Sequence, residues 1–247
     1  MVARNARVIA HTWWVTLSGL AEPVFYLLSI GIGLGKLVGG IPGPGGVIYP
    51  YQVYVAPALL AASAMNGAVY ESTFNVYFKL KYARVYDAVL ATPMEATDVA
   101  RGEIITALSR GALYSGVFVV MMWGLGDVRS AWAAFSLPAA VLVGFAFAAL
   151  GMAATTYMRS WTDFDLVQLA LLPMFLFSTT FYPLSVYPRW LQVVVELTPL
   201  YHGVVLERSL AIGNIGPTLL VHIAYLGALG VGGVAIAGRR IRQLLLA

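Results

Sequence analysis

Charged residues are scarce in this chain, and cysteine is absent. Lysine, arginine, aspartate and glutamate make up 11% of the 247 residues, whereas hydrophobic residues make up 60%. A soluble domain has about 25% charged and about 45–50% apolar residues. The lack of cysteine excludes disulfides and thiol chemistry. The composition therefore argues against an ordinary soluble domain and indicates a chain that resides in a lipid bilayer.

The charges are missing from long continuous stretches. Thirty-four consecutive residues, 37–70, carry no charged side chain, and further charge-free runs cover 111–126, 130–158, 166–188 and 209–238. A charge within the hydrocarbon core is costly, so a bilayer enforces such runs. We therefore expect an all-α polytopic membrane protein, built as a single domain over 1–247. About 20 apolar residues span the core, so six helices fill the chain and leave no room for an ATPase module.

Six membrane spans are expected, and a short helix precedes them. Residues 1–18 mix arginines with tryptophans, which is typical of an interfacial helix. A Gly/Pro-rich turn over 39–46 separates the first two spans. The spans themselves are expected at 23–38, 51–74, 104–123, 133–157, 166–181 and 217–237.

The basic residues divide unequally between the two sides of these spans. One side has Lys36, Arg129, Arg189 and Arg208, and the other has Arg4, Arg7, Lys79, Lys81, Arg84, Arg101, Arg159, Arg239, Arg240 and Arg242. The positive-inside rule places the richer side, and with it both termini, in the cytoplasm. Basic clusters at span ends indicate orientation and contact with membrane lipids, so no nucleic-acid partner is expected.

The longest cytoplasmic segment, 75–98, contains a predicted amphipathic helix. Tyr86, Val89 and Leu90 form one apolar face, which Arg84 and Asp87 flank. Pro93 ends the helix, and Thr97 or Asp98 is placed to cap the following span. Two interpretations stay open: an interfacial helix that covers the bundle, or a docking helix for a cytoplasmic partner.

The segment 182–214 is apolar but broken by Pro183, Pro188 and Pro199. It favours two short helices that enter the outer leaflet and return, because irregular backbone at membrane depth must be buried in protein or line a cavity. An amphipathic surface loop is the alternative.

These segments resemble a known family. Leu197-Thr198-Pro199-Leu200-Tyr201-His202, followed by Arg208, is similar to the signature of ABC-2 type transporter permeases. The stretches 21–27, 31–35, 62–65 and 70–72 resemble the nodulation-factor exporter (NodJ-like) and daunorubicin-exporter permease subgroup, and the likeness covers nearly the whole chain.

The resemblance implies an architecture and partners. It implies six transmembrane helices, a coupling helix at Arg84–Pro93 with Tyr86, Asp87 and Leu90 in it, and re-entrant helices that include His202. It also implies a second permease copy or paralogue, and separate ATP-binding cassette subunits that hold the ATP and magnesium. The chain would then have no catalytic residue, metal or cofactor of its own. The resemblance also implies that it resides in a prokaryotic plasma membrane. The coupling segment departs from the NodJ-like pattern and leaves the ATPase partner open.

Aromatic, methionine and amide side chains are candidates for a translocation path. Adaptable apolar walls suit an amphiphilic substrate such as a drug, lipid, glycolipid or lipo-oligosaccharide. Core packing is the alternative role for each of these residues. The candidates are Met65, Asn66 and Tyr70 in the second span and Phe175 and Phe181 at the fifth.

The remaining ionisable residues suit structural roles. Glu22 and Glu71 are expected to pair with Arg4, Arg7 or Arg101. For His222, inside the sixth span, two interpretations stay open: a functional residue within the membrane, or a neutral histidine that bonds to a neighbouring helix. Two other functions are alternatives. A stand-alone secondary transporter predicts acidic residues at the membrane midplane and internal repeats. A membrane-embedded lipid-modifying enzyme predicts clustered carboxylates or histidines. The sequence has neither pattern.

Overall fold

Helices dominate the computed structural model, which describes residues 24–43, 46–82, 89, 93 and 96–246. Residues 24–38 are helical, with a π-helical stretch inside, and two short strands follow. The elements are η1 (Leu27–Leu34), α3 (Gly35–Val38), β1 (Gly40–Pro42), β2 (Ile48–Pro50), α4 (Tyr51–Tyr70), η3 (Glu71–Asn75), α5 (Val76–Lys81), α7 (Ala96–Leu125), η4 (Ala131–Phe135), α8 (Ser136–Thr155), α9 (Asp163–Phe177), η5 (Leu184–Val186), α10 (Arg189–Glu196), α11 (Pro199–Ile212) and α12 (Thr218–Leu246).

All six expected spans are occupied by helix. In the described part of the chain, four helical stretches are long and apolar enough to cross a membrane: Tyr51–Lys81, Arg101–Leu125, Ala131–Thr155 and Thr218–Gln243. The helices at 24–38 and at α9 are shorter, at 15 residues for α9. The all-α character is therefore confirmed, with four helices of full spanning length.

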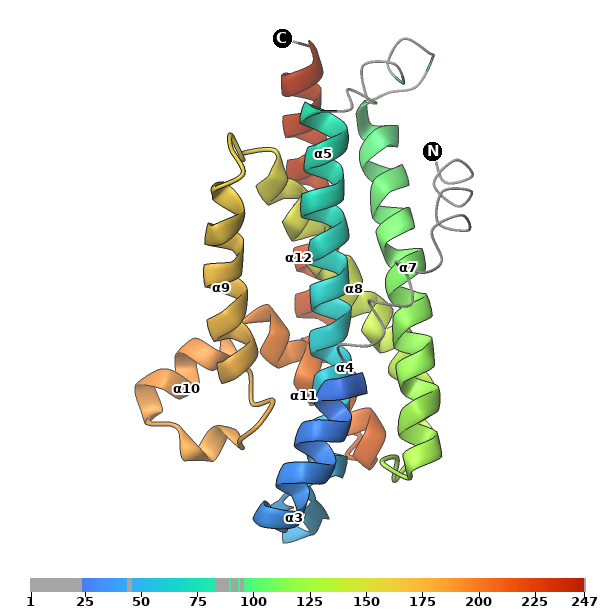
Figure 1. Ribbon diagram of the computed structural model, residues 1–247, viewed down its shortest axis with the longest axis vertical. Coiled ribbons are helices and arrows are strands. Elements are labelled where there is room, and N and C mark those ends of the chain that lie inside the picture. Colours follow the sequence, from blue (N-terminus) through green and yellow to red (C-terminus); the bar gives the residue numbers. More distant parts are fainter. Residues whose placement is uncertain (1–23, 44–45, 83–88, 90–92, 94–95, 247) are drawn as a thin grey trace.

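The long helices run along roughly one axis, so the bundle has two distinct ends (Figure 1). One end, here called the basic end, has the close of α5, the start of α7, the α8–α9 turn and the close of α12; its Lys and Arg residues are Lys79, Lys81, Arg101, Arg159, Arg239, Arg240 and Arg242. The opposite end, here called the hairpin end, has β1, β2, α10 and most of α11.

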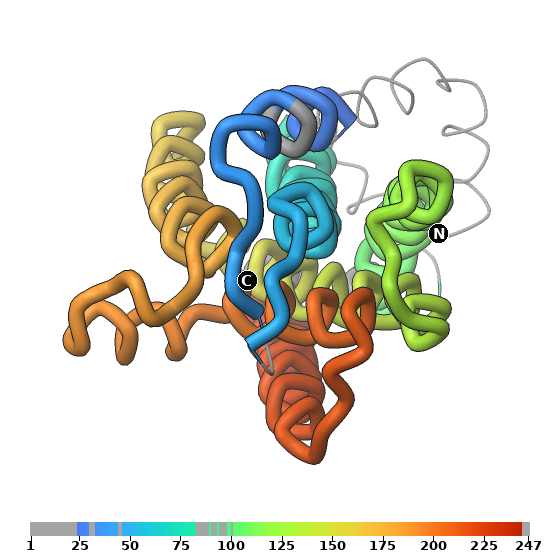
Figure 2. The backbone as a smooth tube through the Cα atoms, turned by 90° about the horizontal axis from the view of Figure 1, so that it is seen from below, coloured from blue at the N-terminus to red at the C-terminus, as the bar shows by residue number. Residues whose placement is uncertain are grey.

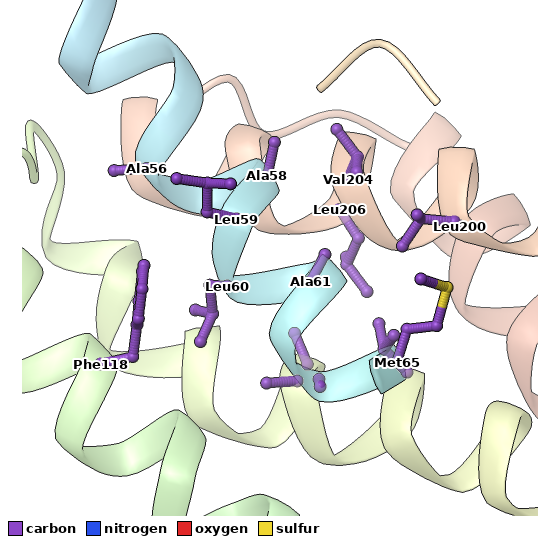
Figure 3. Packing of buried hydrophobic residues seen from close by; sticks show 14 of the residues in the cluster. Ala56, Ala58, Leu59, Leu60, Ala61, Met65, Phe118, Leu200, Val204 and Leu206 are labelled. Atoms are coloured by element: carbon purple, nitrogen blue, oxygen red, sulfur yellow. The ribbon is translucent and has the colours of Figure 1, made fainter. Parts of the chain in front are cut away.

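Helix α4 forms the centre of the bundle because it is apolar on every side and rich in alanine. Figure 2 shows α4 between α7 and α9, with α8 and α12 beyond it. Small side chains let helices approach closely in a membrane protein. Figure 3 shows this packing, in which Ala61 and Met65 of α4 lie near Leu206 and Leu200 of α11.

Two boundaries differ from the sequence prediction. The second span was expected to end at Phe74, but its helix continues through η3 and α5 to Lys81. Helix α7 begins at Ala96, so Thr97 and Asp98 lie inside its first turn and do not precede it. In both cases polar residues extend a helix beyond its apolar run, which hydrophobicity alone does not reveal.

The Gly/Pro-rich turn at 39–46 is part of a two-stranded antiparallel hairpin. Ile41 pairs with Tyr49 at its centre, and Gly39 and Gly46 have φ of 72° and 75°. Glycine adopts such left-handed conformations without a steric penalty, so the glycines that predicted a turn also permit the ribbon to form.

Candidate functional site

A cavity of about 590 Å³ opens beside the central helix. Its walls come from α4, α7, α9 and the first described helix. Aromatic, polar and aliphatic side chains all contribute to its walls. The residues that line it are Tyr26, Leu59, Ala62, Ser63, Asn66, Gly67, Val69, Tyr70, Glu71, Thr73, Phe74, Arg110, Tyr114, Val167, Gln168, Leu171, Leu172 and Phe175.

Three of the five predicted path residues line this cavity: Asn66, Tyr70 and Phe175. Met65 does not, because it is fully buried in the core, where it points toward α11 (Figure 3). Phe181 lies behind the wall, with its ring 5.3 Å from the ring of Phe175 in an edge-on contact. The structure thus brings residues from α4 and α9 to one space and gives Met65 a packing role.

The cavity contains an ion pair between Glu71 and Arg110. Asn75 Nδ2 also donates a 2.7 Å hydrogen bond to Glu71 Oε2. Glu71 begins the π-helical segment η3, and π-helical turns are frequent at functional sites. Glu71 thus forms a structural ion pair, as expected, but its partner is Arg110 of α7 and not Arg101, which is nine residues nearer the basic end, a rise of about 13 Å.

The predicted partners Arg4 and Arg7, together with Glu22, lie outside the described residues. So does the expected interfacial helix over 1–18. A second ion pair, of 2.7 Å, joins Lys79 Nζ of α5 to Glu103 Oε2 of α7 near the basic end. Salt bridges therefore connect the central helix to α7 at two levels.

Arg208, the basic residue of the family-like signature, contacts groups from two distant segments. Its Nε donates to the Tyr54 carbonyl at 3.1 Å and its terminal NH2 donates to the Thr179 carbonyl at 2.7 Å. The guanidinium also lies 3.7 Å from the centre of the Tyr54 ring, a cation–π contact. Arg208 therefore joins α11, α4 and the segment after α9.

The segment that Arg208 holds has an unusual backbone. Thr179 has a φ of 64°, and it is the one positive-φ residue other than glycine in the part of the chain described. This conformation is a steric outlier for a β-branched residue. Hydrogen bonds from Arg208 and, at 3.5 Å, from the Tyr54 hydroxyl converge on its carbonyl. These contacts stabilise a turn that the local sequence disfavours.

The signature histidine contacts the last long helix. His202 Nδ1 lies 2.8 Å from His222 Nδ1, and His202 Nε2 lies 2.9 Å from the Glu196 carbonyl. The Tyr225 ring stacks on His202 with centroids 3.8 Å apart. His222 thus bonds to a neighbouring helix, as one of its two interpretations predicts.

The three prolines of the predicted re-entrant segment mark helix starts. Pro183 precedes η5, Pro188 precedes α10 and Pro199 is the first residue of α11. Proline suits these positions because the first helical N–H groups have no intrahelical partner. Helix α10 is largely exposed at the hairpin end, whereas α11 packs among α4, α8 and α12.

Most of the predicted coupling residues, Arg84, Tyr86, Asp87 and Leu90, lie outside the described residues. Pro93 is exposed in a turn. The helix that leads into this segment is joined to the α8–α9 turn: Trp161 Nε1 donates to the Tyr82 hydroxyl at 2.6 Å. Phe74 stacks on Phe164 nearby, with centroids 4.1 Å apart.

Sequence reasoning missed these aromatic contacts and one buried acid. Glu207 of α11 is fully buried, and neither carboxylate oxygen has a hydrogen-bond partner in the described structure. The signal for Glu207 was present, because it is an acid inside an otherwise apolar stretch. The contact between Tyr82 and Trp161 joins residues 79 positions apart, which no local pattern predicts. Within the described ranges, no metal-binding group of three His, Asp or Glu residues is found.

Comparison with known proteins defines the class. Residues 1–210 match the family described as ABC-2 type transporter, so the chain belongs to the ABC-2 type transporter family. It is therefore an integral membrane protein of a transport family, in agreement with its apolar helices.

Individual relatives are named Nodulation protein J. The chain is 31% identical over 211 residues to that of Sinorhizobium fredii, covering 85% of this chain and 79% of the relative. It is 32% identical over 199 residues to that of Rhizobium leguminosarum bv. trifolii, with coverages of 80% and 74%. For Rhizobium meliloti the identity is 29% over 215 residues, with coverages of 86% and 79%.

Proposed function

We propose that this chain is the permease subunit of an ATP-driven exporter that moves an amphiphilic substrate out of the cytoplasm or the inner leaflet. The observation that carries the proposal is the cavity of about 590 Å³ beside α4, in a chain of the ABC-2 type transporter family. Its walls offer aromatic rings for an apolar group and an ion pair with amides for a polar one. Such a mixed lining suits one molecule with both characters.

The proposed topology has six membrane helices with both termini in the cytoplasm. The excess of lysine and arginine at the basic end supports this orientation under the positive-inside rule. In it, residues 1–18 form the interfacial helix and 75–98 form the coupling segment at the basic end. Helices α10 and α11 form the re-entrant segment in the outer leaflet.

In the proposed mechanism, a cytoplasmic ATPase subunit binds the ATP and magnesium and this chain binds neither. Closure of the ATPase dimer would act on the coupling helix around Asp87 and Leu90. The helix that leads into this segment also forms a wall of the cavity, and the contact between Tyr82 and Trp161 links it to α9, which forms another wall. A push on the coupling segment would therefore alter the space between α4 and α9.

The proposed assembly has two permease subunits, either two copies or a copy and a paralogue. Helix α9 supports this, because leucines on its outward side, such as Leu169 and Leu176, are exposed in the single chain. An apolar face of this kind is covered in the membrane by lipid or by protein. The relatives named Nodulation protein J agree with the resemblance to the nodulation-factor exporter subgroup, and drug, lipid, glycolipid and lipo-oligosaccharide all belong to the proposed amphiphilic class.

The test is to co-express the chain with its candidate ATPase and to measure ATP hydrolysis by the purified complex. Asp87→Ala and Leu90→Ala are expected to abolish substrate stimulation, while Arg189→Ala, at the hairpin end, keeps it. If both coupling variants assemble and hydrolyse ATP like the unaltered chain, the docking role of this helix is wrong.

A further inference from the structure

A second hollow lies against an adjoining face of α9. It is a groove of about 580 Å³ between α8 and α9. Its α9 wall has Leu166, Ala170 and Met174, which recur every four residues and so share one face of the helix. Its α8 wall includes Ala154, and both alanines are exposed. The groove is thus apolar, and small side chains leave it open.

The length of the groove matches the thickness of the hydrocarbon core of one leaflet. It follows α9 from Asp163 to Met174, which is about 16 Å at 1.5 Å per residue. The hydrocarbon core of a bilayer is about 30 Å thick, so each leaflet supplies acyl chains of about this depth. An acyl chain from the leaflet at the basic end would fill the groove along its length.

The end of the groove near the α8–α9 turn is positively charged. Arg159 lines it, and Tyr157, which also lines it, carries the guanidinium of Arg240 4.4 Å from its ring centre. Arg240 Nε is buried without a hydrogen-bond partner in the described structure. Asp163 is the one acid in the lining, and its Oδ2 already accepts from the backbone N–H groups of Arg159 and Ser160.

We propose that this groove binds an anionic glycerophospholipid of the leaflet at the basic end, with one acyl chain between α8 and α9 and its phosphate beside Arg159 and Arg240. Basic pockets between membrane helices on the cytoplasmic side recognise such headgroups. The groove is distinct from the cavity beside α4: Val69, Thr73, Val167 and Leu171 line both spaces, but the other residues that line the groove differ.

The experiment is native mass spectrometry of the purified full chain, titrated with phosphatidylglycerol or phosphatidylcholine. The unaltered chain is expected to bind phosphatidylglycerol more tightly. Ala170→Phe fills the groove and should abolish this binding, and Arg159→Gln should weaken it about fivefold, the effect of one basic residue near an anionic surface. Val231→Phe, on an exposed face of α12, and Arg189→Gln are the matched controls.

Three results would overturn the proposal. One is equal affinity for the two lipids. Another is unchanged phosphatidylglycerol binding in both Ala170→Phe and Arg159→Gln. The third is a change in the oligomeric mass of Ala170→Phe with lipid binding intact, which would assign the groove to a second copy. Arg159 donates its backbone N–H to Asp163 in the turn, and Arg159→Gln keeps this hydrogen bond, so this variant keeps the test informative if Ala170→Phe does not fold.

Discussion

Arg208 connects three segments that are far apart in the sequence, because its guanidinium has several donors in a fixed plane. Two of those donors reach backbone carbonyls of Tyr54 and Thr179, which lie 154 and 29 residues away. Carbonyls buried this deeply need a partner, and a hydrogen bond from a charged donor contributes about 1.5–3 kcal/mol. The Arg208 side chain therefore stabilises the packing of α11 against α4.

We predict that Arg208→Ala lowers the apparent melting temperature of the detergent-solubilised chain, with a loss of at least about 2 kcal/mol. Arg208→Lys keeps the charge but not the planar fork, so it should have an intermediate effect. Thermal unfolding curves of the three proteins provide the measurement. Equal stability of Arg208→Ala and the unaltered chain would show that the guanidinium is dispensable.

A buried acid outside the long helices should make stability depend on pH. Asp127 accepts a 3.0 Å hydrogen bond from Gln52 Nε2, but burial dominates and raises the pKa of its carboxyl group. Because the folded-state pKa is raised, the protonated Asp127 carboxyl group contributes to the free energy of unfolding. This contribution is full below the unfolded-state pKa, about 3.9, and is lost as the pH rises through the folded-state pKa. Asp127→Asn should remove this part of the pH dependence. Melting curves from acid to neutral pH measure it, and the same change of melting temperature with pH in Asp127→Asn and the unaltered chain would contradict the prediction.

At the residue scale, the sequence identified several important positions without their contacts. Arg208 and His202 stood out from a family-like signature, and Asn66 from its place in an apolar run. Their partners could not be foreseen, because a charge-free pattern says nothing about which helices are neighbours. Glu71 illustrates this, since its partner Arg110 was not among the expected arginines.

Among the helices, the charge-free runs located the spans well, because a bilayer excludes charge along a whole helix. They located the ends poorly. The second span extends to Lys81 because Lys79 and Glu103 compensate each other in an ion pair. The π-helical segment η3 was also not predictable, because it depends on Ser72 and Thr73 hydroxyls that bond to the Val69 carbonyl.

The packing of α12 on α8 offers a prediction with a built-in control. A Cβ added at Gly233 would lie 2.8 Å from the backbone carbon of Ala149, whereas one at Gly232 would have no neighbour within 4 Å. Both changes improve helix propensity equally, so their difference isolates the contact. Gly233→Ala should cost about 1–3 kcal/mol, the usual penalty of overpacking, and Gly232→Ala should not destabilise.

Melting curves of the two variants would decide the point. If Gly233→Ala is as stable as Gly232→Ala, the two helices do not approach as closely as described. If only Gly233→Ala melts early, the close approach of α12 and α8 is supported, because small residues at such interfaces are what allow it.

For the whole molecule, α9 is the element that organises the surface. It borders both the cavity beside α4 and the apolar groove, and few of its side chains are fully buried. Helices with few packed contacts are the ones that move most readily. The hydrogen bond from Trp161 to Tyr82, beside the end of α5, joins the start of α9 to the helix that leads into the proposed coupling segment.

Because the chain has no cysteine, a single introduced cysteine reports how accessible its own position in the proposed transport path is to water. Asn66 is exposed to the cavity, and its neighbour Met65 is fully buried in the core. In the complex with its ATPase, we predict that Asn66→Cys reacts with a water-soluble maleimide at a rate that changes when ATP is trapped, while Met65→Cys stays unreactive. A reaction rate at Asn66→Cys that nucleotide does not alter, or that equals the rate at Met65→Cys, would contradict a path between α4 and α9.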